Sequence, residues 1–152
     1  MGNNLDALAD QPFYDLFCRW YEGDPEVSGV ASYTGMEVLT TEPGLCRIAF
    51  TPDKRHANAS NSMQGGVLAA VADAAIGTAL ASTMKENEFF TTLEMKMNFL
   101  RPSPFHQRLE VEGKVVHRGR SMAYMECTVT NEEGKLVARI NSSSMILRKD
   151  PS

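Results

Sequence analysis

The sequence predicts an α+β fold in which a curved antiparallel β-sheet wraps around one long central α-helix. The helix is predicted by residues 58–84, which open with polar residues and a Gly65–Gly66 pair and then run apolar and alanine-rich to Met84. The sheet is predicted by strand-like segments on both sides of this stretch. Those that follow it are separated by short turns, which join antiparallel rather than parallel neighbours.

The central helix carries the first functional clue. From Val67 to Leu80 its only polar side chains are Asp73 and Thr78. A helix that is apolar on every side has to be enclosed, so we expect the sheet to curl around it. The helix should begin near residues 63–65 and fray around residues 85–88. An acid on such a helix is costly to bury unless it is paired or used, which singles out Asp73.

The residues before the sheet are expected to form a short helix. Residues 1–10 should be irregular, and in residues 12–21 large apolar side chains recur at helical spacing from Phe13 to Trp20. Such an amphipathic helix most simply covers the sheet. A Gly-Asp-Pro turn ends it. We therefore divide the chain into an N-terminal helical segment, 1–26, and a main domain, 27–149.

The remaining segments alternate between strands and turns. The pair before the central helix turns at Glu42-Pro43-Gly44. After the helix, apolar and polar residues alternate with a period of two until the strand is broken near Pro102. Two hairpins, around Gly119 and Gly134, complete the sheet. The predicted strands are residues 31–40, 45–51, 91–100, 109–117, 122–130 and 136–147.

The composition fits one globular domain. A chain of 152 residues with 43% hydrophobic and 22% charged residues can bury a sizeable core. The net charge of −4 argues against nucleic acid as the main partner. The three scattered cysteines suit reduced thiols, and the histidines lack partners at metal-ligand spacing, so we expect no metal. Without a secretory pattern or a membrane-length apolar run, we expect a cytoplasmic protein that does not enter membranes.

Asn58, Gln64-Gly65-Gly66 and Ala72-Asp73 form a pattern that resembles the hotdog-fold acyl-CoA thioesterases. The phenylacetate-degradation (PaaI-like) group is the most similar. Three further segments match where that group has them: residues 92–95, 99–102 and 118–121. The resemblance implies a hotdog fold and hydrolysis of an acyl- or aryl-CoA thioester. It also gives the N-terminal helix an alternative role, that of shielding an acyl pocket.

Two positions depart from the pattern of that family. The family usually has His where this chain has Gln64, and Gly where this chain has Asn61. Asparagine tolerates a left-handed backbone, so the loop conformation can survive. Gln64 can still form hydrogen bonds, although it does not titrate.

Hydrolysis of a thioester needs an activated water or nucleophile and donors for the developing oxyanion. The Gly65 amide, at the positive end of a buried helix, is the candidate donor. Asp73 is the candidate base or nucleophile. The two are eight residues apart on one helix, about 12 Å at ~1.5 Å per residue. One thioester therefore cannot reach both in the same chain, which predicts a two-fold homodimer with shared sites.

The other candidate site residues have simpler alternatives. Asn58 either positions substrate or makes a local turn. Thr92 stands where the family has a Ser or Thr that helps to hold the water, although threonines are common in strands. Arg101, Arg118 and Arg120 either grip the phosphates of coenzyme A or form a solvated surface.

The resemblance implies a hydrolase whose substrate includes coenzyme A and which needs no separate cofactor. It also implies that the homodimers pair into a dimer of dimers, a homotetramer. Gln64 motivates a rival interpretation, a non-catalytic hotdog module that binds acyl-CoA as a sensor or carrier. A hotdog dehydratase fits poorly, because those sites resemble a His-plus-acid pair and no histidine lies in the helix-start motif.

Overall fold

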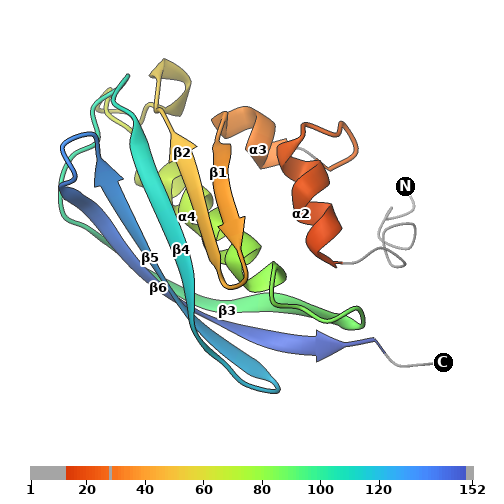
Figure 1. Ribbon diagram of the computed structural model, residues 1–152. Helices are drawn as coiled ribbons and strands as arrows, with labels where there is room; N and C mark the ends of the chain where they lie inside the picture. The colour runs from red at the N-terminus through yellow and green to blue at the C-terminus, as the bar shows by residue number, and fades with distance from the viewer. Residues whose placement is uncertain (1–12, 28, 150–152) are drawn as a thin grey trace.

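The computed structural model describes residues 13–27 and 29–149. The predicted irregular start, residues 1–10, and Pro12, with which the predicted N-terminal helix begins, lie outside these ranges. Within them, a curved sheet forms one layer and helix α4 (Gly65–Ala81) packs against its concave face (Figure 1). This arrangement confirms the predicted α+β architecture.

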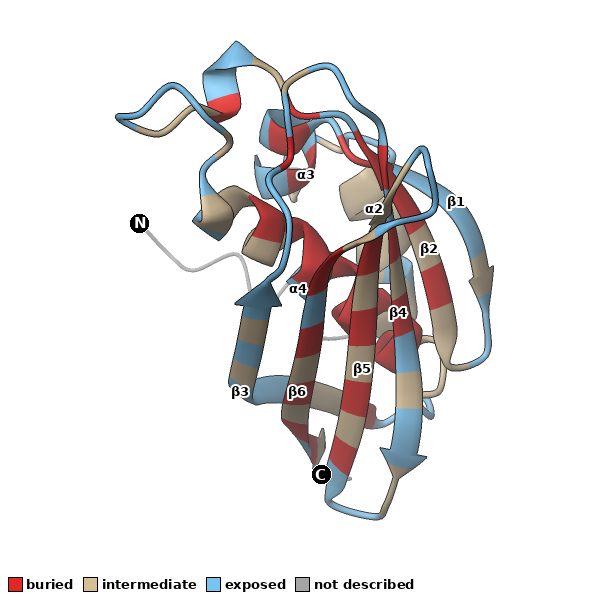
Figure 2. Cartoon of the chain, turned by 90° about the vertical axis from the view of Figure 1, so that its left-hand side faces the viewer, coloured by how far each residue is buried: buried red, intermediate tan, exposed pale blue. Residues whose placement is uncertain are grey.

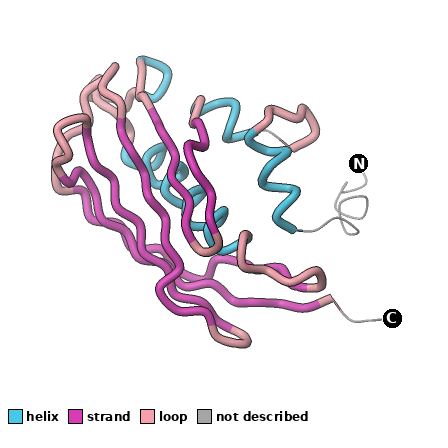
Figure 3. Tube along the Cα trace, in the orientation of Figure 1, coloured by secondary structure: helices cyan, strands magenta, loops and turns pink. Residues whose placement is uncertain are grey.

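The sheet of the described residues has six strands, and every neighbouring pair is antiparallel (Figure 3). The order is β1-β2-β4-β5-β6-β3, so β1 and β3 are the edges. The predicted hairpin turns are confirmed, and Gly44 (φ 79°) and Gly134 (φ 72°) supply their left-handed residues. The strands are β1 (Glu37–Glu42), β2 (Leu45–Phe50), β3 (Glu88–Phe99), β4 (Leu109–Arg118), β5 (Met122–Asn131) and β6 (Leu136–Arg148).

The core lies between α4 and the sheet. Leu68, Val71 and Leu80 of α4 are fully buried, and buried residues alternate with partly exposed ones along β5 and β6 (Figure 2). The helix backbone lies directly against β4 at Gly113, where a Cβ atom would lie 2.6 Å from backbone atoms of Ala75. Only glycine allows this approach, because real Cβ atoms do not come so close to a backbone.

One face of α4 is left uncovered. Gly66 and Asp73 are exposed and Ala69 and Ala70 are half-buried, whereas the rest of the helix from Leu68 onward is buried. Spacings of three and four residues place these four on one side of the helix. The sheet and helices of the single chain therefore enclose most of α4, as expected, and leave open the face that carries the acid.

The helix also ends earlier than predicted. Its last residue is Ala81, and the chain turns before β3 begins at Glu88. The hydroxyl groups of Ser82 and Thr83 donate to the carbonyl oxygens of Ala79 and Leu80, at 2.7 Å each. Side-chain hydroxyls that bond to nearby carbonyls compete with further helical turns.

The segment before β1 contains a helix where a strand was predicted. Helix α3 (Gly29–Thr34) occupies the first part of residues 31–40, and β1 begins only at Glu37. The Thr34 hydroxyl donates to the carbonyl oxygen of Val30 at 2.8 Å, and Gly35 ends the helix with φ 66°. Local hydrogen bonds and packing outweigh the strand preference of Val30, Tyr33 and Thr34 here. The predicted N-terminal helix is present as α2 (Phe13–Tyr21).

A β-bulge interrupts β3. The pairing with β6 shifts between Thr92 and Glu94, which leaves Leu93 as an extra residue that is 54% exposed. Because a bulge adds one residue to the strand, the residues before it lie on the opposite face from the one that strict alternation predicts. Thr92 consequently pairs with the buried Ser144 and faces the helix, although the two-residue pattern places it with Glu94 on the polar side.

At the start of β3, a buried carboxylate is held by two arginines. The side chain of Glu88 is 1% exposed, and it forms ion pairs with Arg118 of β4 and, at 2.8 Å, with Arg148 of β6. It also accepts a hydrogen bond from the backbone amide of Lys85. Burial raises the pKa of Glu88, but the Lys85 amide and the two guanidinium groups outweigh it and hold the pKa below its ordinary value.

We expect Glu88→Gln to lower the free energy of unfolding by on the order of 2–4 kcal/mol at neutral pH, less than for fully enclosed pairs because both arginines reach solvent. An acid whose pKa is lowered in the folded state stabilises the fold at pH values above its ordinary pKa. This stabilisation is lost as the pH falls through the lowered pKa. The difference from wild type should therefore shrink below the ordinary value of 4.5. Urea unfolding across a pH series checks this, with Glu86→Gln as an exposed control; a pH-independent difference would contradict it.

Candidate active site

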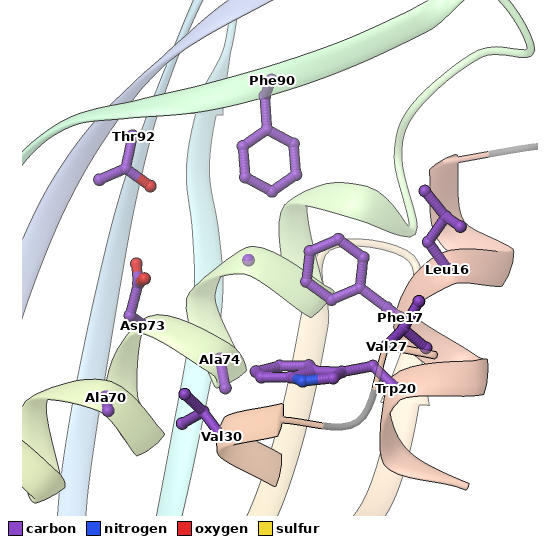
Figure 4. Close-up of a pocket in the computed structure, with 11 residues that line it drawn as sticks. Leu16, Phe17, Trp20, Val27, Val30, Ala70, Asp73, Ala74, Phe90 and Thr92 are labelled. Atoms are coloured by element: carbon purple, nitrogen blue, oxygen red, sulfur yellow. The ribbon is translucent and has the colours of Figure 1, made fainter. Parts of the chain in front are cut away.

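Asp73 lies on the wall of an apolar cavity of about 430 Å³ between α4, α2, α3 and β3 (Figure 4). Figure 4 shows Asp73 pointing from α4 toward Thr92, which points back from β3. Leu16 and Phe17 of α2 lie on the opposite side of the cavity. The volume falls in the range of small-molecule sites, and apolar walls with a few polar groups are typical of such sites. The lining residues are Leu16, Phe17, Trp20, Val27, Val30, Ala70, Asp73, Ala74, Gly77, Phe90 and Thr92.

The environment of Asp73 combines exposure to the cavity with apolar neighbours. Its side chain is exposed in the single chain because it stands on the uncovered face of α4. Partial burial nevertheless raises its pKa, and a hydrogen bond from the Thr92 hydroxyl opposes that rise. The carboxylate is therefore reachable from the cavity, has a single side-chain hydrogen bond affecting its titration, and has an increased affinity for protons.

The start of α4 forms a second site with free backbone donors. Gln64 is the N-cap residue in an extended conformation (φ −70°, ψ 123°), and Gly65 is the first helical residue. The first amides of a helix have no partner within it. The exposed Gln64 side chain forms no capping hydrogen bond. A Cβ atom on Gly65 would lie 2.9 Å from the ring of Phe99, so the backbone lies directly against that ring.

The loop before the helix is held by its own side chains. The Asn58 side-chain oxygen accepts from the amides of Ser60 and Ser62 and from the Ser62 hydroxyl, which is the local turn that sequence analysis gave as the alternative role. Asn61 adopts the expected left-handed conformation, with φ 58°. The buried His56 accepts from the Asp53 amide, and its carbonyl oxygen accepts from the Gln64 amide at 2.8 Å. These bonds fix where the helix begins.

Gly65 and Asp73 line different cavities. The Gly65 cavity, also about 430 Å³, is bounded by Met63, Phe99, Leu100, Arg101, Pro102 and Ser103, and shares no residue with the Asp73 cavity. Within one chain, the structure thus brings Asp73 together with Thr92 but not with Gly65, Gln64 or Asn58. Two separate cavities are consistent with the distance of about 12 Å expected along the helix at ~1.5 Å per residue.

The three candidate phosphate-binding arginines do not gather in one chain. Arg118 is committed to Glu88 at the start of β3, and the Arg120 carbonyl oxygen accepts from Arg148 at the same end. Arg101 follows the other end of β3, beside Gly65, and donates to the Leu136 carbonyl oxygen at 2.6 Å. A strand of this length separates them by roughly 35 Å at ~3.3 Å per residue. Joint binding of phosphate by all three arginines therefore stays a prediction that requires more than one chain.

Several cavity residues were not recognised as site residues from the sequence. Phe17 and Trp20 were assigned to a covering helix, and Phe90, Val27 and Val30 were not singled out. The sequence signal for these residues was the Phe89-Phe90 pair at the start of a strand, which shows that large rings are present but does not show which cavity or surface they face.

Within residues 13–27 and 29–149, no group of three His, Cys, Asp or Glu side chains could hold a metal ion. None of the described helices is long and apolar enough to cross a membrane.

Together, the curved antiparallel sheet, the long helix and the acid on its uncovered face define a protein of the hotdog thioesterase class. Comparison with known families agrees. The sequence model of the Thioesterase superfamily matches residues 61–138, just over half of the chain. The chain belongs to the Thioesterase superfamily.

Individual relatives are more distant. A protein of Saccharolobus solfataricus named as a candidate esterase is 26% identical over 119 residues, covering 78% of this chain and 84% of the relative. The PaaI protein of the E. coli phenylacetic acid degradation operon has a TM-score of 0.76 at 21% identity, covering 89% and 96% of the two chains. A hypothetical thioesterase of Streptococcus pneumoniae, solved with coenzyme A, has a TM-score of 0.74 at 21% identity, covering 83% and 96%. These structural likenesses show the shared hotdog fold.

Proposed function

We propose that this protein hydrolyses acyl- or aryl-CoA thioesters to the free acid and coenzyme A. The observation that carries the proposal is the reachable carboxylate of Asp73, which faces Thr92 on the wall of an apolar cavity. An apolar cavity suits the acyl group, and a carboxylate of raised pKa suits proton transfer near neutral pH. The solved relative that contains coenzyme A supports the choice of thioester.

In the proposed reaction, Asp73 either takes a proton from water, whose oxygen attacks the thioester carbon, or attacks that carbon directly. Thr92 orients Asp73 and the water. The amide of the partner's Gly65 stabilises the negative charge on the carbonyl oxygen. The carbon–sulfur bond then breaks. When water attacks, the proton that Asp73 took passes to the thiolate of coenzyme A. When Asp73 attacks directly, an acyl–Asp73 anhydride forms, and water hydrolyses it to the free acid, which regenerates the carboxylate and supplies the proton for the thiolate. Gln64 and the side-chain amide nitrogen of Asn58, whose oxygen is occupied by the loop, orient the substrate.

A homodimer supplies both groups to one site. The uncovered face of α4 carries Asp73 between small residues, which lets a second helix approach closely. The edge strand β3 beside it has one unpaired side and exposes Leu93 and Phe99, which favours pairing with another copy. A two-fold axis that sets two α4 helices antiparallel places each Gly65 near the partner's Asp73. Further pairing into a homotetramer and a cytoplasmic location are part of the same proposal.

Coenzyme A is proposed to enter along the Gly65 side of the site. Arg101 lines the Gly65 cavity and is the nearest of the three candidate arginines to the oxyanion donor. Guanidinium groups match phosphate oxygens geometrically. Arg118 and Arg120 lie at the other end of β3, so they reach the same ligand only if the partner chain brings them there.

Release of free thiol from a panel of acyl- and aryl-CoA substrates tests the proposal. Hydrolysis of at least one class supports it and identifies the acyl preference. Tight binding without thiol release supports the rival function, a sensor or carrier of acyl-CoA. The exposed, uncapped Gln64 at the position where the family has histidine is the observation that favours this rival.

Thr92 gives a prediction about pH. We expect Thr92→Val to raise the pKa of Asp73 further, because the donor that favours the ionised form is lost. Asp73 acts when deprotonated, so the acid limb of the kcat/KM profile should move to higher pH. The matched control is Thr91→Val, one residue earlier on the strand and outside the cavity. If both variants kept the wild-type acid limb, Thr92 would have no part in tuning Asp73.

A further inference from the structure

Among the described residues that line the cavity beside Asp73, Asp73 is the single ionisable group. Of its eleven lining residues, Asp73 is the only one with a charge, and the others except Thr92 are apolar. An acyl group with a second carboxylate would have to place that charge in apolar surroundings near Asp73, with no cation to pair with it. Both the loss of solvation and the repulsion disfavour such a substrate.

Helix α2 forms the far wall of this cavity and is fixed to α4. The Tyr21 hydroxyl lies 2.8 Å from the Thr78 hydroxyl and donates to the Ala74 carbonyl oxygen at 3.2 Å. The ring of Phe17 rests on Gly77, where a Cβ atom would lie 3.2 Å from the ring. These contacts connect α2 to two adjacent turns of α4.

Phe17 lines the cavity about one helical turn beyond Asp73. Gly77 follows Asp73 by four residues, ~6 Å along the axis at ~1.5 Å per residue. The Phe17 ring stacks with Phe90 of β3 at a centroid distance of 6.1 Å. An acyl group whose carbonyl lies beside Asp73 therefore extends toward a pair of stacked rings (Figure 4).

We propose that α2, through Phe17, sets the length of the acyl group, and that the site selects neutral aromatic or medium-length acyl chains and rejects carboxylated ones. This inference rests on the proposed function. Phe17 and Phe90 contact flat or short apolar groups with their ring surfaces. A long chain would have to displace the Phe17 ring from Gly77.

The test compares wild type with Phe17→Ala and the milder Phe17→Leu. The matched control is Phe89→Ala, which deletes a half-buried ring on β3 that does not line the cavity. Each protein is assayed for kcat/KM on straight-chain thioesters from acetyl- to palmitoyl-CoA, on benzoyl-CoA and on succinyl-CoA. Thermal unfolding is recorded for each variant.

The wild type should favour medium-chain and benzoyl substrates over palmitoyl- and succinyl-CoA. Phe17→Ala should raise the ratio of long-chain to medium-chain kcat/KM by about tenfold or more, as expected when a pocket gains room for methylene groups. Phe17→Leu should shift the ratio in the same direction. An unchanged ratio in folded Phe17 variants, or an equal shift in Phe89→Ala, would overturn the role of α2.

Binding separates this inference from the proposed function. Affinities of non-hydrolysable acyl-CoA thioethers of the same lengths are measured by titration calorimetry. If the wild type releases no thiol from any substrate, hydrolysis is wrong, and the affinity profile of the Phe17 variants still decides whether α2 sets chain length. Preferential wild-type binding of the succinyl thioether would overturn the selection against charge.

Discussion

Asp73→Asn is expected to reduce thioester hydrolysis by about 10²–10⁴-fold, the contribution typical of a positioned acid or base. The substitution keeps the size of the side chain and the possibility of a hydrogen bond with Thr92, but it removes the proton acceptor. The measurement is kcat/KM on the best substrate of the thioester panel. Glu86→Gln, which removes an exposed carboxylate from the loop after α4, should leave kcat/KM unchanged.

Stability should not fall with activity in this variant. Because burial raises the pKa of Asp73, ionising it costs folding free energy as the pH rises through its ordinary value of 3.8 toward the raised one. At neutral pH the uncharged amide side chain introduced by Asp73→Asn avoids this cost. We therefore expect an unfolding temperature equal to or above that of wild type. Undiminished hydrolysis, or loss of activity through unfolding alone, would remove Asp73 from the mechanism.

Gly65→Pro is expected to lower kcat by about 10²–10³-fold through loss of one oxyanion donor. Proline is tolerated at the first helical position, and Gln64 already has the extended backbone that a following proline requires. Gly65→Ala is the matched control. It places a Cβ atom against Phe99 just as proline does, but it keeps the amide N–H. The difference in kcat between the two variants isolates the donor.

Mixing Asp73→Asn chains with Gly65→Pro chains tests whether the site is shared. A mixed dimer has one site built from the intact Gly65 of one chain and the intact Asp73 of the other. Random mixing makes half of the dimers mixed, each with one of two sites restored, so about a quarter of wild-type activity should return. Activity no greater than the average of the two separate variants would show that each chain works alone.

The sequence predicted the main layout because long periodic segments are dominated by burial. The apolar run after Gly65 could only be a core helix, and the turns at Gly44 and Gly134 fixed two hairpins. The strand prediction for residues 31–40 was wrong in its first part, because residues up to Thr34 fold into a short helix through local hydrogen bonds and packing, and it was right from Glu37 onward. Competition between a short helix and a strand depends on such local contacts, which the pattern of apolar and polar residues does not reveal.

The candidate acid, Asp73, could be singled out from the sequence, but the residues that surround it could not. Asp73 stood out through the cost of placing a charge on an apolar helix, and its spacing from Gly65 predicts a site shared by two chains. The aromatic wall of α2 was predicted only as an alternative to a helix that covers the sheet, since helical spacing does not say whether a ring packs on a sheet or borders a cavity. The ion pair of Arg118 with Glu88 was not predicted either, because the two residues lie far apart in the sequence.

The β-bulge at Leu93 determines on which face of β3 the Thr92 side chain lies. In a regular strand that kept Leu93, Thr92 would lie on the outer surface together with Glu94, away from the carboxylate of Asp73. Regular pairing of β3 with β6 through this segment would thus separate Asp73 from Thr92 as effectively as replacing the threonine itself. The bulge at the exposed Leu93, which does not line the cavity, keeps Thr92 on the face of the strand that borders Asp73.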